Sequence, residues 1–337
     1  MANGYNRDVS PTNPHISESF CRLGALYVSR QAQILARQTK GARKQDCESI
    51  HQTRVACRRL REALKVFAGC FGAKRARRWR RKLRRMARRL GPARDADVQA
   101  RRLEEALAGA RAAHRPGIER LALRVAQDRQ AEGSKVVKAI DKFTAGGTME
   151  ALRAAAKKTA GRRANRKAEP AAFDPRAREE IITRLEALRE QALTLEHPED
   201  LEGHHRMRIC AKRLRYTLEM FRPAFGRRLD ETIRRAKELQ TLLGDLHDCD
   251  VWTAQLRRFL EDEQERMVEY CGDSRPLAEL RVGIDALIAA QQDRRRELFR
   301  ALRDNWDELL RARLWEKLAE TLARPVRGVA QPPSAVR

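Results

Sequence analysis

The chain carries one helical motif twice, and this repetition constrains the fold more than any other feature of the sequence. The first copy reads HQTRVACRRLREALKVF over residues 51–67, and the second reads HRMRICAKRLRYTLEMF over residues 205–221. A second matched pair follows at almost the same displacement, LGPARDADV from Leu90 and LGDLHDCDV from Leu243. Two motifs that recur in the same order predict a tandem duplication of one helical unit.

Apolar residues return every three or four positions along nearly the whole chain, which is the period of an α-helix. Alternating runs rich in Val, Ile and Tyr, which are typical of strands, do not occur. We therefore expect an all-α fold. Glycine and proline positions divide the chain into predicted helices at residues 16–39, 47–71, 74–90, 95–112, 116–144, 175–195, 200–221, 227–243, 248–270 and 276–318.

These helices predict a single duplicated domain over residues 16–318. Its first repeat covers about residues 16–156 and its second about residues 176–318, and the polar, basic segment 157–175 is expected to link them. Residues 1–15 and 324–337 contain little core-forming material and are predicted to be flexible.

Each copy of the repeated helix is predicted to have one apolar stripe and one cationic face. The cationic side chains of the first copy fall within an arc of roughly 80° at about 100° per residue: His51, Arg54, Arg58, Arg61 and Lys65. Those of the second copy are His205, Arg208, Lys212 and Arg215. Like charges one helical turn apart repel, so such a row favours an anionic partner. The alternative is a solvated face, but that would be expected to mix the two signs of charge.

A second strongly basic helix follows each copy. Residues 74–89 hold eleven Lys and Arg among sixteen residues, with a thin apolar stripe and no acid. The positions that we expect to extend the anion-binding surface are Arg81, Lys82 and Arg84, together with the aligned Arg234, Arg235 and Lys237. The alternative for residues 74–89 is an exposed helix that only increases solubility.

Two pairs of aspartates, Asp95 with Asp97 and Asp248 with Asp250, recur after the basic helices. They are placed to cap a following helix or to hold an arginine of the repeated helix. A shared metal site is disfavoured, because His247 of the second copy is replaced by Arg94 in the first. Neither a phosphate-binding Gly-rich loop nor a His-Glu-x-x-His motif occurs. We therefore expect no enzyme activity, no metal site and no cofactor.

The doubled pattern of a histidine, an arginine three residues later, a basic pair followed by Leu-Arg, and then a phenylalanine resembles the CHAD family (conserved histidine α-helical domain). The Leu-Gly-x-x-x-Asp-x-Asp-Val segment after each copy fits the same family, and the resemblance covers roughly residues 16–318. It implies two antiparallel four-helix-type bundles, related by a pseudo-two-fold axis around a basic central cleft. It also implies non-catalytic binding of inorganic polyphosphate and association with polyphosphate granules.

Two other functions remain open at this point. A net charge of +26 would also suit a nucleic-acid-binding protein, although aromatic residues make up only 5% of the chain and provide few platforms for stacked bases. The other alternative is a phosphohydrolase whose metal is held by the aspartate pairs.

A cytoplasmic location without a membrane partner is expected from three features. No stretch of 18 apolar residues occurs, and residues 1–14 lack the apolar run of a signal peptide. The seven cysteines are scattered without a Cys-x-x-Cys pair, which indicates reduced thiols.

Overall fold

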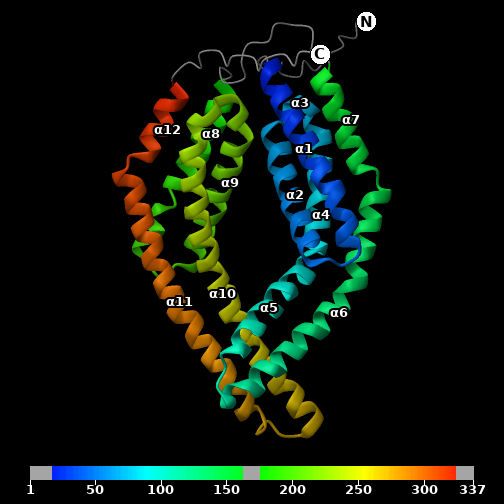
Figure 1. Ribbon diagram of the computed structural model, residues 1–337, viewed down its shortest axis with the longest axis vertical. Coiled ribbons are helices and arrows are strands. Elements are labelled where there is room, and N and C mark those ends of the chain that lie inside the picture. The colour runs from blue at the N-terminus through cyan, green and yellow to red at the C-terminus, as the bar shows by residue number, and fades with distance from the viewer. Residues whose placement is uncertain (1–16, 162–174, 324–337) are drawn as a thin grey trace, which may run out of the picture.

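The computed structural model describes residues 17–161 and 175–323, and within these residues every regular element is a helix (Figure 1). The predicted all-α class is therefore confirmed. The helices before the gap are α1 (Glu18–Arg43), α2 (Cys47–Val66), α3 (Ala68–Phe71), α4 (Ala73–Arg89), α5 (Gly91–Ala108), α6 (Arg115–Ala145) and α7 (Thr148–Gly161). Those after it are α8 (Pro175–Arg189), α9 (Leu201–Phe225), α10 (Asp230–Cys271), α11 (Leu277–Arg311) and α12 (Leu314–Ala323).

The two repeated helices, α2 and α9, begin with the same kind of cap. The Asp46 carboxylate accepts a hydrogen bond from the Ser49 backbone N–H at 2.8 Å, and the Asp200 carboxylate accepts one from the Gly203 N–H at 2.8 Å. Each cap satisfies a backbone donor that the first helical turn leaves unpaired. This fixes where each cationic row starts.

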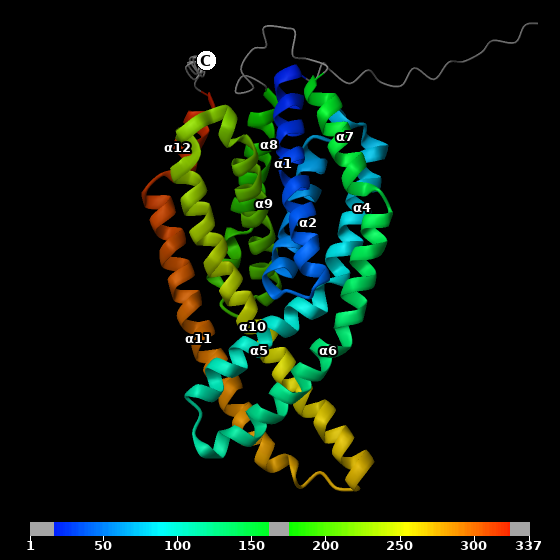
Figure 2. The same ribbon diagram turned by 45° about the vertical axis from the view of Figure 1, so that its right-hand side comes forward.

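Helices α1, α2, α4 and α7 gather on one side of the molecule, and α8, α9 and α12 on the other (Figures 1 and 2). A continuous apolar core joins the two sides. At its centre the Phe20 ring lies 4.8 Å from Phe67 and 5.8 Å from Phe221, measured between ring centroids. The helices expected as two bundles therefore share buried surface, which fixes α2 relative to α9.

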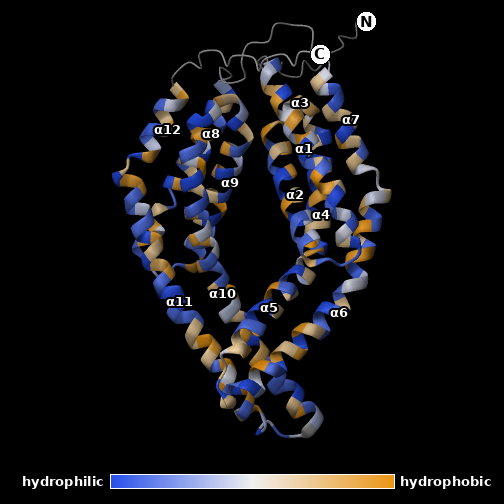
Figure 3. Ribbon diagram, in the orientation of Figure 1, coloured by the Kyte–Doolittle hydropathy of each residue, from blue (hydrophilic) through white to orange (hydrophobic). Residues whose placement is uncertain are grey.

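A second apolar core lies where α5 and α6 converge with the lower parts of α10 and α11, and orange residues mark it in Figure 3. Glycines allow α6 and α11 to approach closely here. A Cβ atom on Gly117 would lie 2.1 Å from the Leu280 carbonyl oxygen, and one on Gly283 would lie 2.1 Å from that of His114. Any larger residue would push the two helices apart.

Several helix boundaries differ from the prediction, and α9 for example continues past Pro223 to Phe225. Helix α10 continues through Gly244, where a break was expected, because the second copy has Asp245 in place of the helix-interrupting Pro92 of the first. Helix α7, residues 148–161, was not among the predicted helices, and the predicted linker 157–175 begins inside it. Residues 162–174 lie outside the described residues. The predicted helix 276–318 is divided near Arg313, whose φ is 52°. The predicted flexible ends, 1–15 and 324–337, also lie outside the described residues.

The cysteine prediction needs a correction. Cys21 of α1 and Cys70 of α3 form a disulfide, although 49 positions separate them in sequence. The sequence pattern did not indicate it, because the pair forms only when α3 lies beside α1 in the folded protein. Disulfides are typical of oxidising compartments, so the cysteines no longer support a cytoplasmic location.

Candidate functional site

The cationic faces of α2 and α9 approach each other, so charges from the two copies act on one another. Burial, together with the positive charges of Arg58 and Arg208, lowers the pKa of Lys212 to about 8. Burial also lowers the pKa of Arg208, to which Arg58 again contributes. Arg58 belongs to α2, whereas Arg208 and Lys212 belong to α9. Basic residues that lie 150 positions or more apart in sequence thus form one cluster of positive charge.

At one end of this cluster lie the first residues of both rows. The pKa of His51 is lowered by burial and by the charge of Arg94. Arg54 lies 4.0 Å from the Asp95 carboxylate and directly beside Gly91, where a Cβ atom would come within 2.8 Å of its guanidinium. The small residue at the start of α5 therefore leaves room for this arginine.

The second copy has a related arrangement at His205. Its Nδ1 atom lies 3.4 Å from Nδ1 of His247, and the two ring centroids are 4.5 Å apart. The pKa of His247 is lowered by burial and by Arg208. Each repeated histidine therefore faces a basic residue of the Leu-Gly-x-x-x-Asp segment, Arg94 in one copy and His247 in the other.

At the other end of the row, basic residues of two further helices join α2. Burial lowers the pKa of Arg61, and Arg84 and Arg80 of α4 add to this effect. Burial also lowers the pKa of Lys65, helped by Arg184 of α8 and Arg213 of α9. We call the combined set the α2–α9 cation cluster, and its members are Arg54, Arg58, Arg61, Lys65, Arg80, Arg84, Arg184, Arg208, Lys212 and Arg213.

Arg80, Arg184 and Arg213 were not among the predicted site residues. Arg80 precedes Arg84 by one helical turn, so helical spacing alone could have identified it. Arg213 aligns with Arg59 in the repeat, which gave a weaker signal. Nothing in the sequence pointed to Arg184, because α8 reaches the cluster only through tertiary packing.

The cluster is not symmetric between the two copies. Glu219 stands at the position of α9 that Lys65 occupies in α2. Its carboxylate binds Arg59 at 3.0 Å and Arg215 at 3.1 Å. Both guanidinium groups also lie over the Tyr216 ring. Arg215, a predicted site residue, thus shares one carboxylate with Arg59. Among the described residues its counterpart Arg61 has no carboxylate within 4 Å, and its pKa is lowered by burial and by Arg84 and Arg80.

Several nitrogen atoms of the cluster are buried and have no hydrogen-bond partner among the described residues: Nη1 of Arg54, Nε of Arg58 and Nε of Arg80. A buried donor without a partner costs about 1–3 kcal/mol relative to a satisfied one. Phosphate oxygens accept hydrogen bonds from guanidinium groups at this geometry. An anionic ligand would therefore satisfy donors that the empty protein leaves unpaired.

The predicted residues of the two further basic helices are divided among different surroundings. Only Arg84 joins the cluster. The Lys82 ammonium donates to the Gly146 carbonyl at 3.2 Å and faces α6. Arg234 pairs with Glu231 and Glu238, and Arg235 pairs with Glu231, Glu238 and Glu308. Arg81 and Lys237 are exposed.

The aspartate pairs hold arginines rather than cap helices, and apart from Arg54, which lies 4.0 Å from Asp95, these arginines belong to helices other than the repeated ones. Asp97 accepts a hydrogen bond from Arg129 of α6 at 2.6 Å, and Asp250 accepts one from Arg295 of α11 at 2.5 Å. Both arginines reach on to backbone carbonyls just before a repeated helix, at Gln45 and Pro198. Asp248 binds Arg102 of α5 at 3.3 Å. In the part of the chain that the structure describes, no group of three or more His, Cys, Asp or Glu is placed to hold a metal ion.

The fold and the cluster define a class of all-α proteins in which two repeated helices bring their basic faces together. The model of the CHAD domain family matches residues 26–257, and the chain belongs to this family. The CHAD domain from the plant Ricinus communis is similar in structure, with a TM-score of 0.64, 23% sequence identity, and coverage of 88% of this chain and 96% of that one.

A second solved structure, PptA from Streptomyces chartreusis, has a TM-score of 0.59 and 15% identity, and the match covers 86% of this chain and 99% of the other. At these identities the two structures support the fold alone. No match is found among curated proteins. Within the described residues, none of the helices has the length and apolar character needed to cross a bilayer.

Proposed function

We propose that the protein binds inorganic polyphosphate on the α2–α9 cation cluster and does so without catalysis. The observation that carries this proposal is the approach of Arg58 to Arg208 and Lys212. These three cations, which come from both copies, outnumber the carboxylates beside them. A chain of linked phosphates supplies closely spaced negative charge along one line. The polyphosphate binding implied by the CHAD resemblance agrees with this chemistry.

Polyphosphate fits the cluster better than duplex DNA does. Cluster residues come from four helices, α2, α4, α8 and α9, which requires a ligand slim enough to contact all of them. Readout of duplex DNA instead requires a protruding element that enters a groove. The arginines and lysines of the cluster lower one another's pKa values across α2 and α9, so we rank nucleic acid second.

A binding titration with charge-reversed variants tests the proposal. Arg58→Glu combined with Lys212→Glu should weaken the binding of long polyphosphate at least tenfold, because it removes cations from both copies and adds carboxylates. Lys157→Glu with Lys158→Glu is the matched control, since it makes the same change in net charge on the exposed surface of α7. All titrations are made at one physiological salt concentration, because such affinities depend on salt.

The same titration with duplex DNA separates the two ligands. Equal losses for both variants would show that only the net charge matters and would overturn the assignment to the cluster. Tighter binding of DNA than of polyphosphate, lost in the Arg58→Glu, Lys212→Glu variant, would favour the nucleic-acid function instead.

The non-catalytic part of the proposal has its own measurement. Incubation with polyphosphate and Mg²⁺ or Mn²⁺ should release no phosphate above the blank, and release that depends on Asp95 or Asp248 would favour the phosphohydrolase alternative.

In the cell, we expect the protein to associate with cytoplasmic polyphosphate granules. A fluorescent fusion should co-localise with stained granules, and the Arg58→Glu, Lys212→Glu variant should not.

A further inference from the structure

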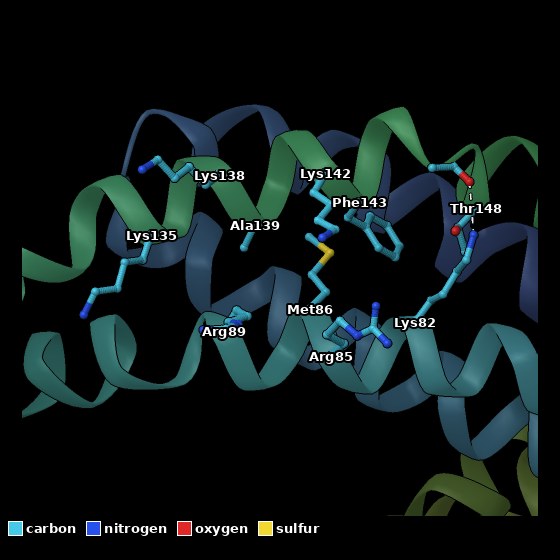
Figure 4. Close-up of a pocket in the computed structure, with 11 residues that line it drawn as sticks. Lys82, Arg85, Met86, Arg89, Lys135, Lys138, Ala139, Lys142, Phe143 and Thr148 are labelled. Carbon is cyan, nitrogen blue, oxygen red and sulfur yellow. Dashed lines mark hydrogen bonds between the residues drawn. The ribbon is translucent and has the colours of Figure 1, made fainter.

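A cavity of about 510 Å³ lies between α4 and α6, and it shares no residue with the α2–α9 cation cluster. Its floor is apolar and consists of Met86 of α4 with Ala139 and Phe143 of α6 (Figure 4). Cavities of a few hundred Å³ with an apolar floor are typical of sites for small molecules. The two rims carry six basic residues: Lys82, Arg85, Arg89, Lys135, Lys138 and Lys142.

Acidic residues do not balance the positive charge of the two rims. No acidic residue lines the cavity. Of the six basic side chains, only Lys135 has a carboxylate partner within 4 Å among the described residues, Glu132 at 2.7 Å. Lys82 donates to the Gly146 carbonyl, which holds its ammonium at one end of the cavity. Such a rim favours a ligand that carries several negative charges.

One polar atom of the cavity lacks any partner. Thr148, the first residue of α7, is 2% exposed, and its hydroxyl makes no hydrogen bond among the described residues. Figure 4 shows Thr148 at the same end of the cavity as Lys82. A buried hydroxyl without a partner destabilises the empty protein. A ligand group that exchanges a hydrogen bond with this hydroxyl would remove that penalty.

We propose that this cavity binds a nucleoside triphosphate. The heterocyclic base would lie on Met86 and Phe143, whose sulfur atom and ring both contact flat aromatic groups favourably. The phosphates would lie between the lysines and arginines of the two rims, where the Thr148 hydroxyl is within reach of one end of the ligand. The apolar floor distinguishes this ligand from a bare phosphate chain, which gains nothing from contact with carbon atoms.

The choice of a small molecule over a macromolecule follows from the shape of the cavity. Its volume suits one ligand of nucleotide size, and the unpartnered Thr148 hydroxyl is buried, where a membrane surface or a partner helix would not reach. Because the cavity and the α2–α9 cation cluster have no residue in common, either proposal can fail without the other.

Calorimetric titration with ATP, inorganic triphosphate and adenosine tests the inference. ATP should bind at least tenfold more tightly than either fragment, because only ATP uses both the rims and the floor. Lys138→Glu with Lys142→Glu should weaken ATP binding at least tenfold, since both side chains are exposed and their replacement leaves the core intact. The control pair Lys157→Glu, Lys158→Glu should have little effect.

Thr148→Val keeps the volume of the side chain and removes the hydroxyl. It should leave the thermal midpoint unchanged or raise it, and weaken ATP binding about threefold to tenfold. The Arg58→Glu, Lys212→Glu variant should bind ATP as the parent does.

Four results would overturn the inference. The first two are the absence of ATP binding and equal affinity for triphosphate and ATP. The third is a loss of ATP binding in the Arg58→Glu, Lys212→Glu variant without a loss in the Lys138→Glu, Lys142→Glu variant. The fourth is an unchanged ATP affinity in Thr148→Val. Binding of anionic vesicles or of an acidic peptide without ATP binding would instead assign the cavity to a macromolecule.

Discussion

In the absence of a ligand, the surroundings of Lys212 disfavour the positive charge of its side chain. Burial and the neighbouring Arg58 and Arg208 lower its pKa to about 8 from 10.5. A bound polyanion reverses the local field, so the pKa of Lys212 rises on binding and the complex takes up a proton. One side chain thus couples the affinity for polyphosphate to pH.

We expect the affinity of the parent protein for polyphosphate to fall as pH rises from about 7 to about 9.5, measured by titration at constant salt. Lys212→Arg should bind nearly as well at pH 7 and should lose most of this decline, because arginine stays charged over the whole range. An equally steep decline in Lys212→Arg would contradict the assignment to Lys212.

The same charge affects the stability of the empty protein. The folded state binds fewer protons than the unfolded state between pH 8 and 10.5, so the free energy of unfolding should rise with pH in that window. Lys212→Met should therefore raise it by about 1–2 kcal/mol at pH 7, a figure reduced for solvent screening.

His51 should give a second pH dependence at lower pH. Burial and Arg94 lower its pKa in the empty protein, and a bound polyanion should raise it, so affinity should increase as pH falls from about 8 to about 6. Replacing both repeated histidines, His51→Gln with His205→Gln, should reduce this increase. His197→Gln, on an exposed loop, is the control. An unchanged pH profile in the double variant would mean that the histidines only support the helices.

At the scale of an element, helix α4 has two basic faces with different surroundings. Arg80 and Arg84 lie near Arg61 of α2, whereas Lys82 faces α6 together with Arg85 and Arg89. The residues alternate along the helix because a 100° step places neighbours in sequence on different sides. A count of basic residues in α4 therefore overestimates the number available to either ligand.

The variants Arg80→Glu and Lys82→Glu separate these faces. Arg80→Glu should weaken polyphosphate binding roughly fivefold to twentyfold, because the new carboxylate faces Arg61 and Lys65 within the cluster. Lys82→Glu makes the same change in charge and should change polyphosphate affinity less than twofold. Similar losses in both variants would show that α4 acts only through its total charge.

Helix α9 has a glutamate where α2 has a lysine, and this position determines which nearby cations have a carboxylate partner. The Glu219 carboxylate binds Arg59 and Arg215, whereas Lys65 of α2 adds a further positive charge. A polyphosphate chain on the cluster should therefore follow α2 toward Lys65 and Arg80 rather than cross the Glu219 side.

Glu219→Gln should strengthen polyphosphate binding roughly threefold to tenfold, because it releases two arginines toward the ligand. It should also lower the free energy of unfolding by about 1–2 kcal/mol, since two half-buried guanidinium groups lose their carboxylate. Glu186→Gln on the exposed face of α8 is the control and should change neither quantity. Weaker binding in Glu219→Gln would mean that Glu219 positions the arginines for the ligand.

For the molecule as a whole, the two copies are joined at two levels. Near the cluster the phenylalanine contacts hold α1, α2 and α9 together. Further down, the fully buried Glu263 of α10 accepts hydrogen bonds from Arg120 and Arg124 of α6 at 2.7 and 2.6 Å. Arg266 binds the same carboxylate at 2.7 Å. Since α6 follows the first repeated helix and α10 follows the second, this ion cluster fixes the relative position of the copies.

Glu263→Gln should lower the free energy of unfolding by about 2–4 kcal/mol, because three arginines lose a buried counter-ion. The effect should be measured by denaturant unfolding, with exposed Glu265→Gln as the control. Although burial acts to raise the pKa of Glu263, the three arginines lower it overall. The difference between parent and variant should therefore be present above about pH 4.5 and diminish as pH falls. A difference independent of pH would argue against a charged Glu263.

The sequence by itself determined the features that depend on local periodicity. Apolar spacing identified the all-α class, and the doubled motif identified the CHAD family and the cationic faces of residues 51–65 and 205–215. These follow from the sequence because the α-helical repeat alone decides which side chains share a face.

Only the tertiary structure decided which of those faces meet and which charges remain free. The Glu219 carboxylate binds Arg59 of α2 across 160 positions of sequence, in addition to its local partner Arg215 in α9, so the pairing of Arg59 could not be predicted from periodicity. Lys82 lies in a cavity with α6 whereas Arg80 joins the cluster, because their surroundings depend on how α2 and α6 pack against α4. Periodicity places a side chain on a helix, but its partners, and with them its pKa and its availability to a ligand, are set by contacts between distant segments.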